Sequence, residues 1–149
     1  MTDVRGRIAR YRVRLGFVAA AIALWLATPA RQSLVAGAAI AFVGEAIRIW
    51  AAGHLEKGRE VTASGPYRLT RHPLYVGSAV IGVGFAIASA SVVVSLLVAI
   101  YLGVTIVAAI RGEERHLTEK FGNAYPEYRD GRAAAAPRRF SVARAMANR

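Results

Sequence analysis

Four long apolar stretches, separated by short polar segments, dominate the chain. They cover roughly Leu15–Ala30, Leu34–Gly53, Leu74–Ala90 and Val92–Ile110. The shorter ones lie near the lower limit of about 17 residues that a helix needs to cross a bilayer. This pattern predicts an all-α, multi-pass membrane protein with four transmembrane helices.

The residues between and after these stretches indicate how the helices are joined. A tight turn over residues 28–33 connects the first two stretches and predicts an antiparallel helix pair. Beyond Ile110 a helical pattern continues through residues 111–121, and Gly122 is a natural helix stop. Small residues that allow close helix approach recur in the second and third stretches; they include Gly37, Gly44, Gly77, Gly82 and Gly84.

The same pattern divides the chain of 149 residues into three parts. Residues 1–14 form a basic cytosolic segment, and residues 15–131 form a single membrane domain. Within that domain, residues 54–73 and 111–128 are expected to cap the helices on the cytosolic side. Residues 132–149 form a basic tail that is rich in alanine and arginine and is expected to be mobile.

The net charge is +11, and the basic residues are distributed along the chain as expected for a membrane protein. All but two of the 20 lysines and arginines lie before the first stretch, between the second and third, or after the fourth. Such an excess marks the cytoplasmic side, so both termini and the loop 54–73 are expected in the cytoplasm. Attraction to anionic lipids accounts for surplus charge of this kind, and nucleic-acid binding is not predicted.

The composition narrows the class further. Cysteine is absent, which excludes disulfides, thiolate nucleophiles and cysteine-ligated metals. The three histidines have no zinc-like spacing, so no metal site is predicted. The first stretch could be a signal peptide, but it is long for one and lacks a clean cleavage site, so it is interpreted as a retained anchor. A bias toward arginine and alanine favours a bacterial cytoplasmic membrane.

The segment 64–77 carries most of the candidate chemistry. It reads Ser-Gly-Pro-Tyr-Arg-Leu-Thr-Arg-His-Pro-Leu-Tyr-Val-Gly and enters the third stretch. The free N–H groups at the start of that helix, beside Arg71 and His72, form a corner that attracts anions. Tyr67 and Tyr75 offer aromatic faces for an adenine ring or a sulfonium cation. An ordinary helix start, with interface tyrosines and an arginine that snorkels to the membrane surface, would have the same residues.

Two pairs of ionisable residues lie inside or beside the apolar stretches. Glu113 and Glu114 follow the fourth stretch and, as helix neighbours, point about 100° apart, so both cannot face one partner equally. Glu45 and Arg48 lie within the second stretch, where a charge costs about 2.5–3.5 kcal/mol. This second pair is either a structural ion pair or part of the wall of a substrate or proton pathway.

The segment 64–77, the helical hairpin expected from the third and fourth stretches, and the glutamate pair together resemble the isoprenylcysteine carboxyl methyltransferase and phospholipid methyltransferase superfamily of integral membrane enzymes. The similarity runs from about Val61 to Tyr128. The Arg-His-Pro-x-Tyr segment, followed by the glutamate pair, is its specific part. The matching residues are Ser64-Gly65-Pro66-Tyr67, Arg71-His72-Pro73-Leu74-Tyr75-Val76-Gly77, Glu113-Glu114 with Leu117, and Phe121-Gly122 with Tyr125 and Tyr128.

The resemblance implies that S-adenosylmethionine is the cofactor and that its pocket lies between the last two spans and their cytosolic caps. The residues that would line this pocket by position are Val61, Thr62, Tyr67, His72, Pro73, Leu74 and Tyr75. Glu113 or Glu114 would hold the cofactor's polar end. In the eukaryotic prenylcysteine enzymes an arginine shortly before the glutamates binds the substrate carboxylate, and Arg111 lies near that position, although offset. The family often has a histidine where this chain has Arg59-Glu60.

The expected function is methyl transfer to a hydrophobic or lipid-like acceptor that enters from the bilayer, with His72, Arg71 and Arg111 as the candidate catalytic residues. A carboxylate acceptor is already ionised at neutral pH, whereas an amine or thiol would need His72 or a glutamate as a base. The alternative is a small four-helix transporter that uses Glu45 as a proton-coupled site. A third hypothesis is a non-enzymatic membrane scaffold.

Overall fold

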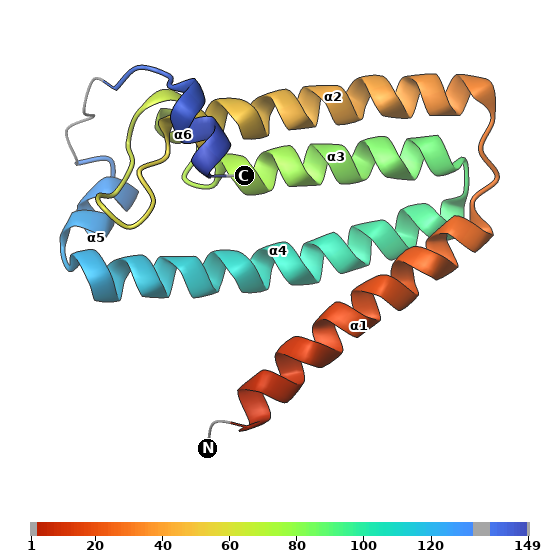
Figure 1. Ribbon diagram of the computed structural model, residues 1–149, viewed down its shortest axis with the longest axis horizontal. Helices are drawn as coiled ribbons and strands as arrows, with labels where there is room; N and C mark the ends of the chain where they lie inside the picture. The colour runs from red at the N-terminus through yellow and green to blue at the C-terminus, as the bar shows by residue number, and fades with distance from the viewer. Residues whose placement is uncertain (1–2, 133–137, 149) are drawn as a thin grey trace.

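The computed structural model describes the backbone of residues 3–132 and 138–148. Every regular element in these residues is helical, which confirms the predicted all-α class (Figure 1). The elements are α1 (Asp3–Leu26), α2 (Arg31–His54), the short 3-10 helix η1 (Gly65–Arg68), α3 (Pro73–Ser89), α4 (Val92–Phe121), α5 (Ala124–Arg129) and α6 (Val142–Ala147).

Helices α2 and α3 lie side by side along their lengths because glycines of one face glycines of the other (Figure 1). A Cβ atom added to Gly44 would lie 2.7 Å from the carbonyl oxygen of Gly77. A Cβ atom added to Gly84 would lie 2.6 Å from the carbonyl oxygen of Gly37. Backbones can approach this closely only where side chains are absent, so these two glycine pairs set the spacing of the helices.

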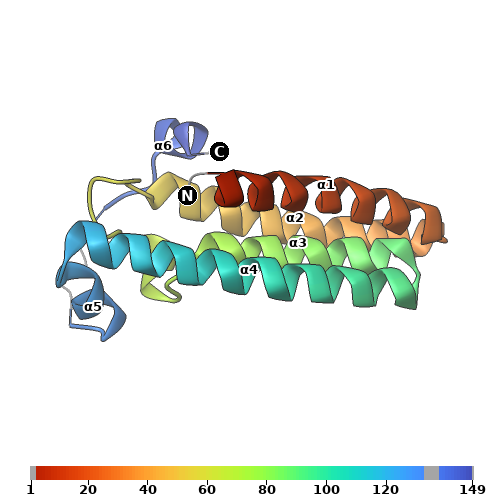
Figure 2. The same cartoon turned by 90° about the horizontal axis from the view of Figure 1, so that it is seen from below.

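Helices α3 and α4 form a hairpin whose second arm is much longer than the first. Ala90 ends α3 in the left-handed conformation with φ of 49°, and the Ser91 hydroxyl accepts a hydrogen bond from the Val94 N–H at 3.4 Å to cap α4. With 30 residues, α4 is about 45 Å long. It therefore carries Glu113 and Glu114 beyond its apolar part to the polar end of the molecule, where α5 and α6 also lie (Figure 2).

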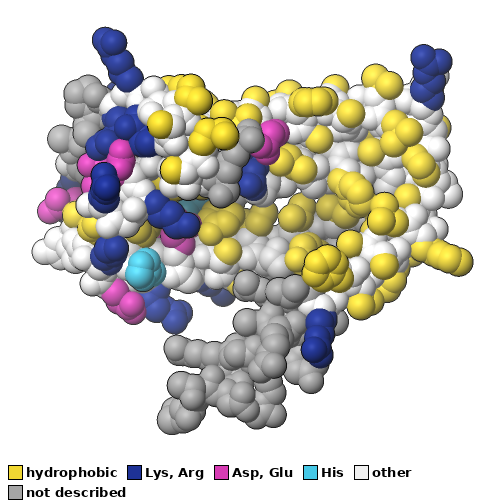
Figure 3. Space-filling view, in the orientation of Figure 1, with side chains coloured by type: hydrophobic (Ala, Val, Ile, Leu, Met, Phe, Trp, Pro, Cys, Tyr) yellow, Lys and Arg dark blue, Asp and Glu magenta, His cyan; other side chains and the backbone are white. Residues whose placement is uncertain are grey.

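Two of these helices, α2 and α4, are long and apolar enough to cross a membrane. The apolar part of α1, Gly16–Leu26, and the helix α3 are shorter. The exterior of the bundle is covered with apolar side chains, whereas charged side chains gather at the end that holds α5 and α6 (Figure 3). Exposed apolar surface of this extent marks a region that contacts lipid or another protein, while the crossing of all four helices remains a prediction.

Helix α1 departs from the predicted arrangement in two ways. It ends at Leu26 rather than Ala30, and Thr28 in the following linker donates its backbone N–H to the Ser89 carbonyl at 2.9 Å. Instead of pairing with α2 along its length, α1 diverges from the other three long helices and contacts α4 (Figure 1). The prediction of an antiparallel pair of the first two spans was therefore wrong, because the short linker is tied to the α3–α4 turn.

The C-terminal part of the chain makes contacts that the sequence did not predict. Residues 138–148 pack on the end of α2, and the Ser141 N–H donates to the Gly53 carbonyl at 3.1 Å. The ring of Phe140 lies against Gly53 and 6.0 Å from the ring of His54, measured between centroids. This segment is therefore part of the polar end of the fold, and residues 133–137 of the predicted tail lie outside the described residues.

Candidate functional site

A cavity of about 740 Å³ opens at the polar end, among the loop after α2, the start of α3, the end of α4 and α5. Its volume lies within the range of about 300–1,000 Å³ that is typical of small-molecule sites. The structure brings seven of the predicted site residues to its wall: Val61, Thr62, Tyr67, Arg71, Leu74, Tyr75 and Glu113. Segments far apart in the sequence thus meet around one space.

The Gly-Pro-Tyr turn positions Tyr67 in the wall of this cavity. Gly65 has φ of +56°, and a Cβ atom there would lie 2.6 Å from Cγ of His54, so glycine is required on both counts. On the other side, the Tyr128 hydroxyl donates to the Tyr67 carbonyl at 2.6 Å. The Tyr67 hydroxyl is buried and has no hydrogen-bond partner among the described atoms. Burial, and then the charge of Glu113, raise its pKa, so it is a neutral donor available to a ligand.

His72 and Glu114 join the start of α3 to the end of α4. The Nε2 atom of His72 lies 3.1 Å from Oε1 of Glu114. The Tyr125 hydroxyl donates to the same oxygen at 3.0 Å, and Nη1 of Arg71 lies 3.6 Å from it. The hydrogen bond from His72 is the main cause that lowers the pKa of Glu114, opposed by desolvation. Glu114 is thus committed to three protein side chains, two from the segment just before α3 and one from α5.

Glu113 has different surroundings from its neighbour. Its side chain is 43% exposed and lines the cavity, and Oε2 lies 3.9 Å from Nδ1 of His72. Tyr75 also lines the cavity and interacts electrostatically with this carboxylate. Of the two carboxylates, Glu113 is therefore the one available to a ligand, and the histidine ring lies between both of them.

Four predicted site residues do not line the cavity. His72, Pro73 and Glu114 lie just behind its wall, where Pro73 is fully buried and the His72 side chain is 12% exposed. Their position is that of residues that hold the wall in place. Arg111 is exposed on α4 and is not brought to the cavity.

Arg48 and Ser78 line the cavity although neither was among the predicted site residues. The Nη1 atom of Arg48 donates to Oγ of Ser78 at 2.5 Å, and its Nε lies 3.4 Å from Oε2 of Glu45. Gly77 makes room for this arginine, because a Cβ atom there would lie 2.6 Å from Cγ of Arg48. The signal in the sequence was a charge inside an apolar stretch. Glu45, the basis of the transporter hypothesis, contacts Arg48 but is not in the cavity wall.

A second cavity, of about 570 Å³ and mostly apolar, lies among α1, α3 and α4. Its wall includes Phe17, Ala20, Phe85 and Leu102. Ser78 lines both this cavity and the polar one. The two spaces therefore approach each other at Ser78, where a polar ligand in one would lie beside an apolar ligand in the other.

Among the side chains that the structure describes, no group of three or more histidines, aspartates and glutamates is placed to hold a metal ion.

These features define a helical membrane protein in which a polar cavity and an apolar one meet. The chain belongs to the phospholipid methyltransferase family, whose model matches residues 11–124. It is 31% identical over 134 residues to the cobalt-zinc-cadmium resistance protein CzcN of Cupriavidus metallidurans, covering 83% of this chain and 59% of that protein. It is also 31% identical over 108 residues to the nickel-cobalt-cadmium resistance protein NccN of Alcaligenes xylosoxydans xylosoxydans, covering 71% and 47%.

The chain thus spans about half the length of the curated relatives it matches. No solved structure matches it.

The lowered pKa of Glu114 predicts a loss of stability in acid. Its contacts contribute fully above the ordinary pKa of 4.5 and are lost as the pH falls through the lowered value. Between about pH 5 and about pH 3 the melting temperature of the wild type should fall more steeply than that of Glu114→Gln. Glu119→Gln, an exposed change on the same helix, should follow the wild type. Equal slopes for wild type and Glu114→Gln would contradict this role.

Proposed function

We propose that the protein is a membrane-embedded, S-adenosylmethionine-dependent methyltransferase that acts on a hydrophobic or lipid-like acceptor. Membership of the phospholipid methyltransferase family supports the reaction class. The observation that carries the proposal is the cavity on which Tyr67, Arg71, Tyr75 and Glu113 converge, beside an apolar cavity. A polar methyl donor and an apolar acceptor need two such adjoining spaces.

The residues of the polar cavity fit the cofactor. The free hydroxyl of Tyr67 is a hydrogen-bond donor without a protein partner, and Glu113 offers a carboxylate to an ammonium or sulfonium group. The aromatic faces of Tyr67 and Tyr75 suit an adenine ring or a cation. Arg71 and Lys120 also line the space and would attract the cofactor's carboxylate. S-adenosylmethionine, when bound, supplies an electrophilic methyl group.

The chain's own contribution is alignment of the two reactants and exclusion of water. An acceptor carboxylate would be ionised on arrival. An acceptor amine would have to lose a proton, and Glu113 or His72, which lies between the two glutamates, would be the nearest base. Both O-methylation and N-methylation are therefore compatible with these residues.

The apolar cavity is the proposed place of the acceptor's hydrocarbon part. Its walls on α1, α3 and α4 would face the bilayer if all four long helices cross it, with both termini on the cytoplasmic side. The polar cavity then opens to the cytoplasm, where the cofactor is dissolved. The acceptor's reactive group would reach the polar cavity near Ser78, which lines both cavities, and near Arg48, which donates a hydrogen bond to Ser78.

Calorimetry on the detergent-purified protein tests the proposal. We expect S-adenosylmethionine and S-adenosylhomocysteine to bind, and Tyr67→Phe to weaken binding about tenfold, because one hydrogen bond is lost in a buried place. The melting temperature of the free protein should hardly change, since this hydroxyl has no protein partner. Labelled cofactor incubated with lipid extracts would then identify the acceptor. A purified, folded protein that binds neither compound would refute the proposal.

A further inference from the structure

The C-terminal residues 138–148, here called the C-terminal clasp, supply hydrogen-bond donors to the end of α2. The last carbonyls of a helix have no partners within it. The Asn148 amide donates to the carbonyls of Ala52 at 3.1 Å and Leu55 at 2.8 Å. Nε of Arg144 donates to the Gly53 carbonyl at 3.0 Å. A cation at this place also interacts favourably with the helix dipole.

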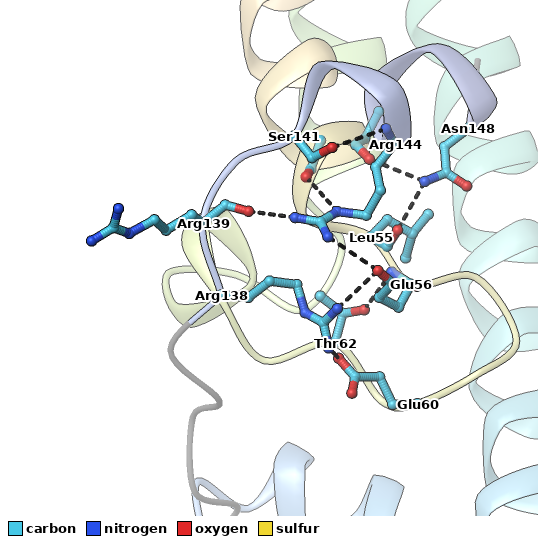
Figure 4. Close-up of polar contacts among 11 residues, drawn as sticks. Leu55, Glu56, Glu60, Thr62, Arg138, Arg139, Ser141, Arg144 and Asn148 are labelled. Carbon is cyan, nitrogen blue, oxygen red and sulfur yellow. Dashed lines mark hydrogen bonds and ion pairs between the residues drawn. The ribbon is translucent and has the colours of Figure 1, made fainter.

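The same clasp holds the loop that follows α2 (Figure 4). Arg138 donates from Nη1 to Oε1 of Glu56 at 2.8 Å and from Nη2 to Oε1 of Glu60 at 2.5 Å. Arg144 donates from Nη1 to the same oxygen of Glu56 at 3.2 Å. The Glu56 side chain is only 17% exposed, so these contacts are partly shielded from water. Shielding strengthens hydrogen bonds between charged groups.

This loop is one wall of the polar cavity. Residues 55–58 and 60–62 line the cavity, and Asn148 of the clasp lines it as well. The Glu56 N–H donates to Oγ1 of Thr62 at 3.0 Å and closes the loop on itself. This wall is therefore held by a distant segment of the chain, whose first residue, Arg138, lies 82 residues after Glu56.

We propose that the C-terminal clasp is a positioning element of the cofactor site, in which Arg138 and Arg144 fix the loop 55–62 against the cavity. This inference rests on the proposed function. By pairing with Glu56 and Glu60, the two arginines also keep these carboxylates from competing with Glu113 for the cofactor's positive charge. Arg138 and Arg144 act through the loop, so they are positioning residues.

The double variant Arg138→Gln/Arg144→Gln tests the inference against Arg139→Gln as a control. The Arg139 side chain is exposed and extends away from the cluster (Figure 4). In the double variant we expect the Kd of S-adenosylhomocysteine to rise about tenfold. The KM for S-adenosylmethionine should rise likewise, with kcat at saturating cofactor nearly unchanged. Arg139→Gln should match the wild type, and Arg138→Lys/Arg144→Lys, which keeps the charges but not the forked donors, should restore part of the affinity.

Limited trypsin cleavage separates this inference from the proposed function. Lys57 and Arg59 are exposed in the loop, and cleavage after them should accelerate about tenfold in the double variant, with or without cofactor. Faster cleavage with an unchanged Kd would overturn the positioning role, and an unchanged cleavage rate would overturn the contact itself. A wild-type protein that binds no cofactor would contradict the proposed function, while the cleavage rates would still report on the clasp.

Discussion

Gly44→Ala is expected to destabilise the protein by about 3 kcal/mol. The new methyl group would lie 2.7 Å from the Gly77 carbonyl oxygen and 2.8 Å from the backbone nitrogen of Ile81. Both are backbone atoms of α3, so the contact can be relieved only if the two helices move apart. Because Arg48 reaches Ser78 across the same interface, the polar cavity should be disturbed together with the fold.

Thermal unfolding in detergent, followed by circular dichroism, measures this effect. Gly103→Ala is the matched control, because a Cβ atom at Gly103 of α4 would have no neighbour within 4 Å. The same chemical change there should be neutral or stabilising by up to about 1 kcal/mol, since alanine has the higher helix propensity. If both variants melt alike, the glycine contact does not set the spacing of α2 and α3.

The sequence predicted that α2 and α3 would approach closely, but not which residues would meet. Runs of small residues in both apolar stretches indicated close approach. Which glycines would face each other depends on the rotation of each helix about its axis, and the sequence alone does not determine that rotation. The place of α1 was mispredicted for a similar reason. A short linker limits the distance between helix ends, but it leaves the crossing angle free.

The sequence predicted more of the residues around the polar cavity than of the contacts between the helices. The turn at Gly65-Pro66 and the helix start at Pro73 are local features, and the structure has both at the expected positions. That the two glutamates have different surroundings followed from their separation of about 100° on the helix. Which of them faces the cavity was not predictable, because it depends on Tyr125 of α5 and on Arg71. The C-terminal clasp has no recognisable pattern in the sequence, because its contacts join single arginines to glutamates about 80 residues away.

Glu113→Gln is expected to have the largest effect on function. Glu113 lines the cavity, and a hydrogen bond to a charged group contributes about 1.5–3 kcal/mol. The Kd of S-adenosylmethionine should therefore rise about 100-fold. The melting temperature should change little, because the side chain is 43% exposed. Glu114→Gln should do the reverse and lower the melting temperature, since its carboxylate contacts His72, Arg71 and Tyr125.

Calorimetry with two ligands extends this comparison of the glutamate variants. S-adenosylhomocysteine keeps the ammonium group of the cofactor but has no sulfonium charge. A loss of affinity for both compounds in Glu113→Gln would place the carboxylate at the ammonium group, whereas a loss confined to S-adenosylmethionine would place it at the sulfonium. An unchanged affinity in Glu113→Gln, with a large loss in Glu114→Gln, would exchange the roles of the two residues. Their different positions in the structure argue against that exchange, because Glu113 lines the cavity and Glu114 does not.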